Sequence, residues 1–314
     1  MAIYFFDATA NAHQQITQLF DFVWPTATGM WNLRWQVAGY VQAVPGATVE
    51  QLRSRFSEGA DIHGANLRRA CVEHSWNQQR ETFAGILLTN TFAVYEGWIE
   101  HVLDDLGKNT NSLRKSLQFP EDPVKGTGVR SAIAEINLNE SNALKNNFYA
   151  ALCGGPNYAI ANLNAMMLCY RFFKEMRNCQ MHGGGVADQK LVDAYTNFLP
   201  FATVATLGVG EVPKHAPVVL GGNVILDLRG VVGFSHIVLK MMATLDAEIS
   251  KSQTAEKPFI KRWKQKHPQK YIMTGGAEAR KQKIKNLLKH AHFPEPSNPM
   301  AVETWLKHLN LVSA

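Results

Sequence analysis

Residues 163 to 185 read LNAMMLCYRFFKEMRNCQMHGGG, an apolar segment that ends in polar side chains and three glycines. Six large apolar residues recur at helical spacing and predict a helix buried along most of its length: Leu163, Met166, Met167, Tyr170, Phe173 and Met176. Gly183 suits the left-handed conformation that closes a helix, and the next two glycines leave room for a bulky group near the backbone. A buried helix that ends in Arg177, Asn178 and His182 is therefore a candidate site for chemistry.

The spacing of the polar residues limits how they act together. Asn178 and His182 are four residues apart and share a helix face, whereas Arg177 and His182 are separated by roughly 140° and about 7.5 Å. Arg177 and His182 can therefore meet only around a shared ligand or through a partner helix. A guanidinium binds phosphate oxygens through paired donors, and an imidazole transfers protons near neutral pH. The alternative is that Arg and His satisfy the last carbonyls of the helix.

Two motifs resemble a known superfamily. Arg177-Asn178-x-x-x-His182 followed by glycine resembles the R-N-x-x-x-H signature of HEPN domains, which are all-α and include many metal-independent endoribonucleases. Leu88 to Leu106 resembles the first core helix of the RiboL-PSP branch, where an aromatic-Glu-x-aromatic motif, here Tyr95-Glu96-Gly97-Trp98, precedes a leucine-rich tail. The resemblance covers roughly residues 82 to 249 and implies a mainly α, HEPN-like helical bundle.

The resemblance also implies a reaction. In an enzyme of this family, His182 would assist attack of the ribose 2′-OH on the adjacent phosphorus, and Arg177 would stabilise charge on the phosphoryl oxygens. Asn178 and Glu96 would position these groups. Glu100 lies one turn further on and competes with Glu96 for the acidic role, and a solvated carboxylate is the alternative for Glu96. The implied reaction uses no metal and no cofactor.

The composition indicates a globular, reduced protein. The chain has 314 residues, of which 46% are hydrophobic, and we find no run of the roughly 18–20 apolar residues that a membrane span needs. The first residues lack the order of charged and apolar segments found in a signal peptide. The four cysteines form no CxxC pair, and the 11 histidines form no cluster with metal-ligand spacing. We expect a cytoplasmic protein without disulfides, a zinc site or a membrane partner.

The N-terminal third predicts helices and one strand. We expect a helix over residues 8 to 22 and, from the alternation of Leu33, Trp35 and Val37, a strand over residues 31 to 44. Thr48-x-x-Gln51 is typical of a capping box. Residues 62 to 107 predict one very long helix or two in line.

The segment after the glycines predicts a short helix over residues 188 to 198 and then a hairpin. Two apolar triplets at 218 to 220 and 224 to 226 flank Gly221-Gly222-Asn223, whose residues tolerate the positive φ of a tight turn. Residues 234 to 249 return to helical spacing. His215 and His236 favour packing or solvent exposure over chemistry.

The last fifth of the chain is basic. Residues 251 to 314 contain 13 Lys and Arg against 4 Asp and Glu, a net charge of +9, whereas the whole chain carries +6 and the first 250 residues therefore −3. This asymmetry is typical of a segment that contacts nucleic acid. Aromatic and basic residues alternate in a candidate RNA-binding run, in which we single out Lys261, Arg262, Trp263, Lys264 and Lys266. The alternatives are a solvated basic face and, more weakly, an anionic membrane surface.

The sequence thus predicts three parts: an N-terminal extension (1–60), a HEPN-like helical domain with a small β hairpin (61–250) and a basic C-terminal helical module (251–314). The expected function is a metal-independent endoribonuclease. The family suggests an RNA-restricting toxin or antiviral defence effector that forms a homodimer and has an inhibitory partner protein. The alternative is a non-catalytic helical dimer that binds nucleic acid through its C-terminal module. The sequence identifies neither the RNA nor a trigger.

Overall fold

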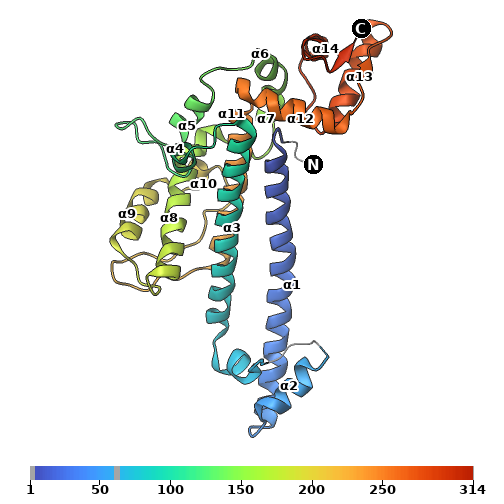
Figure 1. The fold of residues 1–314 in the computed structure, drawn as a ribbon. Helices are drawn as coiled ribbons and strands as arrows, with labels where there is room; N and C mark the ends of the chain where they lie inside the picture. Colours follow the sequence, from blue (N-terminus) through green and yellow to red (C-terminus); the bar gives the residue numbers. More distant parts are fainter. Residues whose placement is uncertain (1–3, 60–63, 314) are drawn as a thin grey trace.

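The structure is a computed structural model that describes residues 4–59 and 64–313, and it is mainly α-helical (Figure 1). Its α-helices are α1 (Asp7–Ala43), α2 (Val49–Ser57), α3 (Trp76–Leu106), α4 (Asn111–Ser116), α5 (Val129–Ile136), α6 (Asn142–Leu144), α7 (Ala150–Cys153), α8 (Leu163–His182), α9 (Gln189–Phe198), α10 (Val204–Leu207), α11 (Leu228–Ile249), α12 (Glu256–Lys266), α13 (Ala277–His290) and α14 (Pro299–His308). The two short strands β1 (Tyr271–Ile272) and β2 (Val312–Ser313) pair in parallel. The prediction of a mainly α fold is confirmed.

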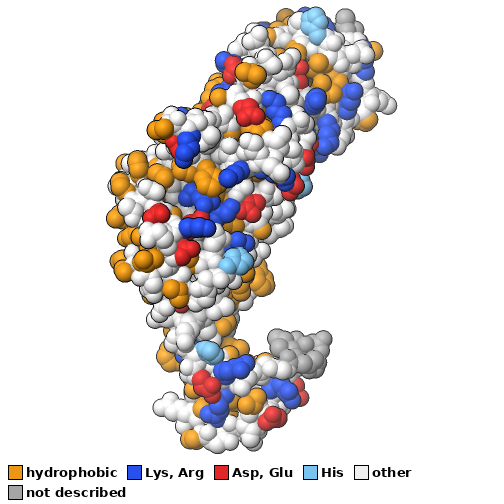
Figure 2. All heavy atoms as spheres, turned by 60° about the vertical axis from the view of Figure 1, so that its left-hand side comes forward, with side chains coloured by type: hydrophobic (Ala, Val, Ile, Leu, Met, Phe, Trp, Pro, Cys, Tyr) orange, Lys and Arg blue, Asp and Glu red, His pale blue; other side chains and the backbone are white. Residues whose placement is uncertain are grey.

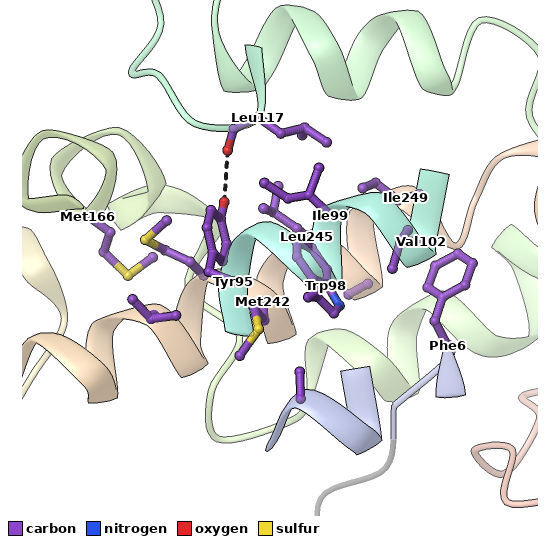
Figure 3. Packing of buried hydrophobic residues seen from close by; sticks show 14 of the residues in the cluster. Phe6, Tyr95, Trp98, Ile99, Val102, Leu117, Met166, Met242, Leu245 and Ile249 are labelled. Carbon is purple, nitrogen blue, oxygen red and sulfur yellow. Dashed lines mark hydrogen bonds between the residues drawn. The ribbon is translucent and has the colours of Figure 1, made fainter. Parts of the chain in front are cut away.

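Helices α3, α8 and α11 form the centre of the body, and all three sequence stretches were predicted to be helical. Figure 3 shows the close packing of their side chains around Tyr95 and Trp98. The Tyr95 hydroxyl donates to the Leu117 carbonyl over 2.8 Å, and Trp98 Nε1 donates to Thr9 Oγ1 over 2.8 Å. Helix α11 is long and apolar enough to span a membrane, but 67% of its most apolar window is buried inside the protein. Its apolar character therefore belongs to the core.

Helix α1 is longer than predicted. It continues through Pro25 to Ala43 and runs beside α3 in the opposite direction, with α2 at the far end of the pair (Figure 1). The predicted strand over residues 31 to 44 is therefore wrong. Val37 is buried and Leu33 packs beside it in a small second hydrophobic cluster, whereas Trp35 is exposed. Positions four residues apart face the same way on a helix, so the short apolar alternation was ambiguous.

The segment predicted as one very long helix or two in line is divided: a helical turn, Arg69–Glu73, precedes a break at His74 and Ser75. Helix α3 starts at Trp76, where Ser75 and Gln78 form a capping box, and it ends at Gly107, which has φ 67°. The start that we predicted, Ile62, lies outside the described residues. The capping box of α2 at Thr48 and Gln51 is confirmed.

The predicted β hairpin is wrong. Residues 221 to 224 pair with the glycine turn after α8: Val224 N–H donates to the Gly185 carbonyl over 2.8 Å, and Ala187 N–H donates to the Gly222 carbonyl over 2.9 Å. Val219, Leu220 and Ile225 are exposed, whereas Val224 and Leu226 are buried and Val218 packs against the same core cluster. The loop before α11 therefore fixes the exit of α8 instead of folding back on itself.

The N-terminal and C-terminal parts share the core of the body. One hydrophobic cluster contains residues from Phe5 to Val312, including Trp263 of α12. Near the start of α1, the buried Asp246 carboxylate accepts hydrogen bonds from the N–H groups of Phe5 and Phe6, over 2.7 and 3.0 Å. Burial raises the pKa of Asp246 to about 6. The three-part division of the chain stays a prediction about folding units, since all three parts contribute to this cluster.

Candidate active site

The end of α8 holds Arg177 and Asn178 in contact. Arg177 Nη1 donates to Asn178 Oδ1 over 3.2 Å, and Asn178 Nδ2 donates to Glu175 Oε2 over 3.0 Å. Glu175 is 7% exposed and forms an ion pair with Arg171, one turn earlier on the same helix. The two arginines thus lie at the ends of a polar chain that runs through Glu175 and Asn178. This chain fixes the amide of Asn178 with its oxygen toward Arg177.

Sequence reasoning missed Glu175 and Arg171. The signal was available, because Arg171 and Glu175 are four residues apart and Glu175 and Asn178 are three apart, spacings at which helix side chains meet. Arg171 also stacks on Phe119, with its guanidinium carbon 4.2 Å from the ring centroid. The loop that contains Phe119 therefore supports the polar chain from outside the helix.

His182 is exposed as the last residue of α8. It lies one turn beyond Asn178, on the same side of the helix, as predicted. The helix closes there because the Gly183 and Gly185 N–H groups donate to the Cys179 carbonyl over 2.9 and 3.0 Å. The prediction that Gly183 is left-handed is wrong, since its φ is −102°. The two glycines that follow it, at φ 62° and 79°, have the left-handed backbone instead.

Arg177 opens onto a pocket of about 430 Å³ between the end of α8 and the first half of α3. Glu81 and Thr82 of α3 line one side, and Gln180 and Leu226 line the other. Gln180 Nε2 donates to the Val224 carbonyl over 2.6 Å and so connects the pocket to the paired loop. Arg177 Nε is buried and has no hydrogen-bond partner among the residues that the structure describes. Because Nε is closed off from solvent, only the Nη groups of Arg177 can reach a ligand in the pocket.

Glu96 and Glu100 each have a partner other than the signature residues. Glu96 Oε1 accepts from Lys174 Nζ over 2.8 Å, and Lys174 lies one turn before Asn178 on α8. Glu100 Oε1 accepts from Arg114 Nη1 over 3.2 Å. Within residues 4–59 and 64–313, neither carboxylate has a hydrogen bond to Arg177 or His182. Of the two, Glu96 is the one joined to the signature helix.

The candidate RNA-binding run on α12 has two different sides. Lys261, Lys264 and Lys266 are exposed, whereas Arg262 is 4% and Trp263 1% exposed. Arg262 Nε lies 2.8 Å from Asp7 Oδ1. Arg262 and Trp263 were singled out as RNA-binding residues, but both are buried and the Trp263 ring is part of the core, so neither is placed to contact RNA. Figure 2 shows basic side chains over the upper end of the molecule, where the C-terminal module lies, and a second group on the middle of the same face.

The described part of the chain contains no group of three His, Cys, Asp or Glu side chains placed to hold a metal ion. All four cysteines are free thiols. His215, which we expected to serve packing, contacts the aromatic rings of Phe172, Tyr195 and Phe198 away from the polar chain. Comparisons of the chain with protein-family models, with curated protein sequences and with solved structures return no match.

Proposed function

We propose that this protein is a metal-independent endoribonuclease of the HEPN type. His182 assists attack of the ribose 2′-OH on the adjacent phosphorus, and Arg177 stabilises the negative charge that builds on the phosphoryl oxygens. Asn178 orients Arg177. The products are a 2′,3′-cyclic phosphate end and a free 5′-hydroxyl end, so the reaction consumes no water in its first step.

The observation that carries the proposal is the placement of Arg177. Its guanidinium contacts Asn178 and lines an open pocket at the end of α8. His182 is exposed one turn beyond Asn178 and is not among the residues that line this pocket. A guanidinium whose donors are not consumed by the fold is suited to phosphate. An arginine that caps the helix would instead donate hydrogen bonds to the last carbonyls of α8, and Arg177 makes no such bond among the described residues.

The surroundings fit a polynucleotide substrate. The pocket beside Arg177 is lined by the amides of Gln78 and Gln180 and by the carboxylate of Glu81, which are suited to the donors and acceptors of a nucleobase. The exposed lysines of α12 supply positive charge for the RNA backbone further away. Glu96 holds Lys174 near the signature and so acts on the site through that lysine. We also propose that the active unit is a homodimer, that the protein acts in the cytoplasm as an RNA-restricting toxin or defence effector, and that a partner protein restrains it.

The test is the end chemistry of RNA incubated with the protein in EDTA. Wild-type protein should yield cyclic phosphate ends, and Arg177→Ala and His182→Ala should each lower the cleavage rate by on the order of 10²-fold or more. His308→Ala is the matched control, because His308 is also the exposed last residue of a helix but lies in the C-terminal module. Wild-type rates in both site variants would remove this site from consideration.

The alternative is a non-catalytic helical dimer that binds nucleic acid through the basic module. The exposed lysines of α12 and the net charge of +9 over residues 251–314 favour it. The same experiment separates the two functions. RNA that stays intact, together with binding that survives both site substitutions, supports the binding protein and contradicts the nuclease.

A further inference from the structure

One side of α1, about 90° around the helix from its buried positions, carries an aromatic stripe, which we define as Phe20, Trp24, Trp31 and Trp35. At 100° per residue these four positions fall within about 60° of one another around the helix, and they extend about 22 Å along it. Trp24, Trp31 and Trp35 are 47%, 37% and 63% exposed. Figure 1 shows α1 as the outermost helix of the α1–α3 pair on the side away from α8. Trp31 also packs on Trp76 at the start of α3, with ring centroids 4.9 Å apart, and Phe20 packs against the core. The solvent-exposed part of the stripe is therefore formed by the three indoles.

The helix that carries the stripe is poor in charge. After its first turn, Asp21 and Arg34 are its only charged residues, whereas 18% of the whole chain is charged. It also contains Pro25, Gly29 and Gly39, which are weak helix formers. The intrinsic helix propensity of these residues stabilises such a helix only weakly, so its stability depends on packing against other elements. The composition is typical of a helix that is covered in its working state.

The stripe is symmetric about its own midpoint, which falls after Ala27. Phe20 lies as many residues before this midpoint as Trp35 lies after it. Trp24 and Trp31 are related in the same way. When two copies of a helix pair antiparallel about a two-fold axis, residues at equal distances from the axis come opposite one another. The aromatic residues of one copy would therefore face aromatic residues of the other along the whole stripe.

The two charges of the helix follow the same symmetry. Asp21 and Arg34 are equally far from the midpoint, so the antiparallel pair brings Asp21 of one copy level with Arg34 of the other and keeps like charges apart. Arg34 is partly exposed, and the side-chain hydrogen bond that it makes among the described residues is from Nη1 to the His74 carbonyl. Ala27 and Thr28 at the axis are small enough for the two helices to approach closely.

We propose that the aromatic stripe is a homodimer interface, in which the α1 helices of two chains pack antiparallel about a two-fold axis next to Ala27 and Thr28. The exposed parts of the three indoles amount to about 370 Å² per chain, taking about 250 Å² per side chain. Both copies together supply about 740 Å², which is the size of a weak or transient interface. We expect the dimer to dissociate in the micromolar range.

Other occupants of the stripe fit less well. A helix that lies on a membrane usually carries several Lys and Arg residues on its polar face, and α1 has only Arg34. Among the described helices, α11 and not α1 has the length and hydropathy of a membrane span. The proposed contact is independent of the nuclease activity. It lies on α1, so two chains that share one phosphate at Arg177 and His182 would need a second, separate contact between their α8 ends.

The test is sedimentation of the full-length chain over a range of concentrations. Wild-type protein should show a monomer–dimer equilibrium in the micromolar range, and Trp24→Glu and Trp35→Glu should each raise the dissociation constant at least 10-fold. Phe22→Glu is the matched control: Phe22 is 63% exposed, but it points to the opposite side of α1 and should leave the equilibrium unchanged. Far-UV circular dichroism checks that each variant is folded.

Cysteine cross-linking tests the axis directly. With helix axes about 9 Å apart and Cα atoms about 2.3 Å from each axis, the two copies of residue 28 have Cα atoms about 6 Å apart, within reach of a disulfide. Thr28→Cys should therefore form a covalent dimer under mild oxidation. Gly29→Cys is the control, because Gly29 faces open space on the other side of the helix.

Several results would overturn the proposal. These are a monomer at all accessible concentrations, a dimer that survives both tryptophan substitutions, and equal cross-linking through residues 28 and 29. Binding to vesicles of neutral or anionic lipid by a protein that stays monomeric, lost in Trp24→Glu, would assign the stripe to a membrane instead. Cleavage of RNA has no part in these readouts, so failure of the nuclease proposal would leave them unchanged.

Discussion

Asn178 donates a hydrogen bond to the buried carboxylate of Glu175 over 3.0 Å, and its amide oxygen is thereby turned toward Arg177. The buried carboxylate of Glu175 therefore fixes a single orientation of the Asn178 amide. Glu175 is in turn paired with Arg171, so the orientation of Arg177 depends on three residues of the same helix.

Glu175→Gln should slow cleavage without preventing binding of RNA. A neutral amide pairs less well with Arg171 and Asn178, so Arg177 loses its fixed orientation; we expect kcat to fall on the order of 10-fold while KM changes little. Single-turnover and steady-state rates on one oligonucleotide measure this. Unfolding in urea should show a modest loss of stability.

Glu96→Gln is the comparison variant for Glu175→Gln. Glu96 also pairs with a basic residue of α8, but its side chain is 42% exposed, and exposed ion pairs contribute about 0–1 kcal/mol. We expect a smaller loss of rate than for Glu175→Gln and almost unchanged stability. A larger loss of rate in Glu96→Gln would reverse the roles assigned to the two carboxylates.

The exposed lysines of α12 should contribute to the salt dependence of RNA binding. The variant replaces three of them by glutamine: Lys261, Lys264 and Lys266. Each phosphate contact on a single strand contributes about 0.7 to the slope of log K against log salt, so the slope should fall by about 2. Binding titrations at several salt concentrations measure it.

A matched control removes the same number of exposed lysines from the body of the protein: Lys125, Lys190 and Lys214. An equal change of slope in the control would show that α12 has no special role. Deleting residues 251 to 314, the simpler experiment that the sequence alone suggests, is unsuitable. It would uncover Phe5 and Phe148, which pack against rings of the C-terminal module.

Mixed dimers should test whether residues of two chains act on one phosphate. Arg177 and His182 lie on different faces of one helix, so a second chain can complete the site. Mixing inactive Arg177→Ala and His182→Ala proteins should then restore part of the cleavage, because some mixed dimers contain one intact copy of each residue. Activity that stays at the level of the separate variants, in a mixture shown to exchange subunits, contradicts a shared site.

Asp246 predicts a pH dependence of stability. Burial raises the pKa of its carboxyl from 3.8 to about 6 in the folded protein. Between about pH 4 and pH 6 the folded state therefore keeps a proton that the unfolded chain has lost, and stability falls as the pH rises. The expected loss is about 3 kcal/mol, and it is complete above the folded pKa.

Asp246→Asn cannot ionise and should lack this part of the pH dependence. Urea unfolding between pH 4 and pH 7 measures the free energy of unfolding of both proteins. As the pH rises, this free energy should fall more in the wild type than in Asp246→Asn. Parallel pH profiles would show that Asp246 keeps an ordinary pKa.

The sequence was sufficient for elements whose signals are local. The capping box at Thr48 and Gln51 was predicted from its residue types and is confirmed. The buried stripe of α8 follows from its helical period. The spacing of apolar residues gave a wrong prediction for residues 31 to 44, because a short apolar alternation fits a strand as well as one side of a helix. Only the cluster around Val37 distinguishes the two.

The sequence by itself determined the helical fold and placed Arg177, Asn178 and His182 at the end of a buried helix. The tertiary structure alone decided that Glu96 meets Lys174, that Trp263 is buried and that residues 221 to 224 pair with the glycine turn. The physical reason is the range of the interactions. Helical period and caps depend on residues within about one turn, whereas these contacts join residues 34 to 78 positions apart, or a ring to a core assembled from both ends of the chain.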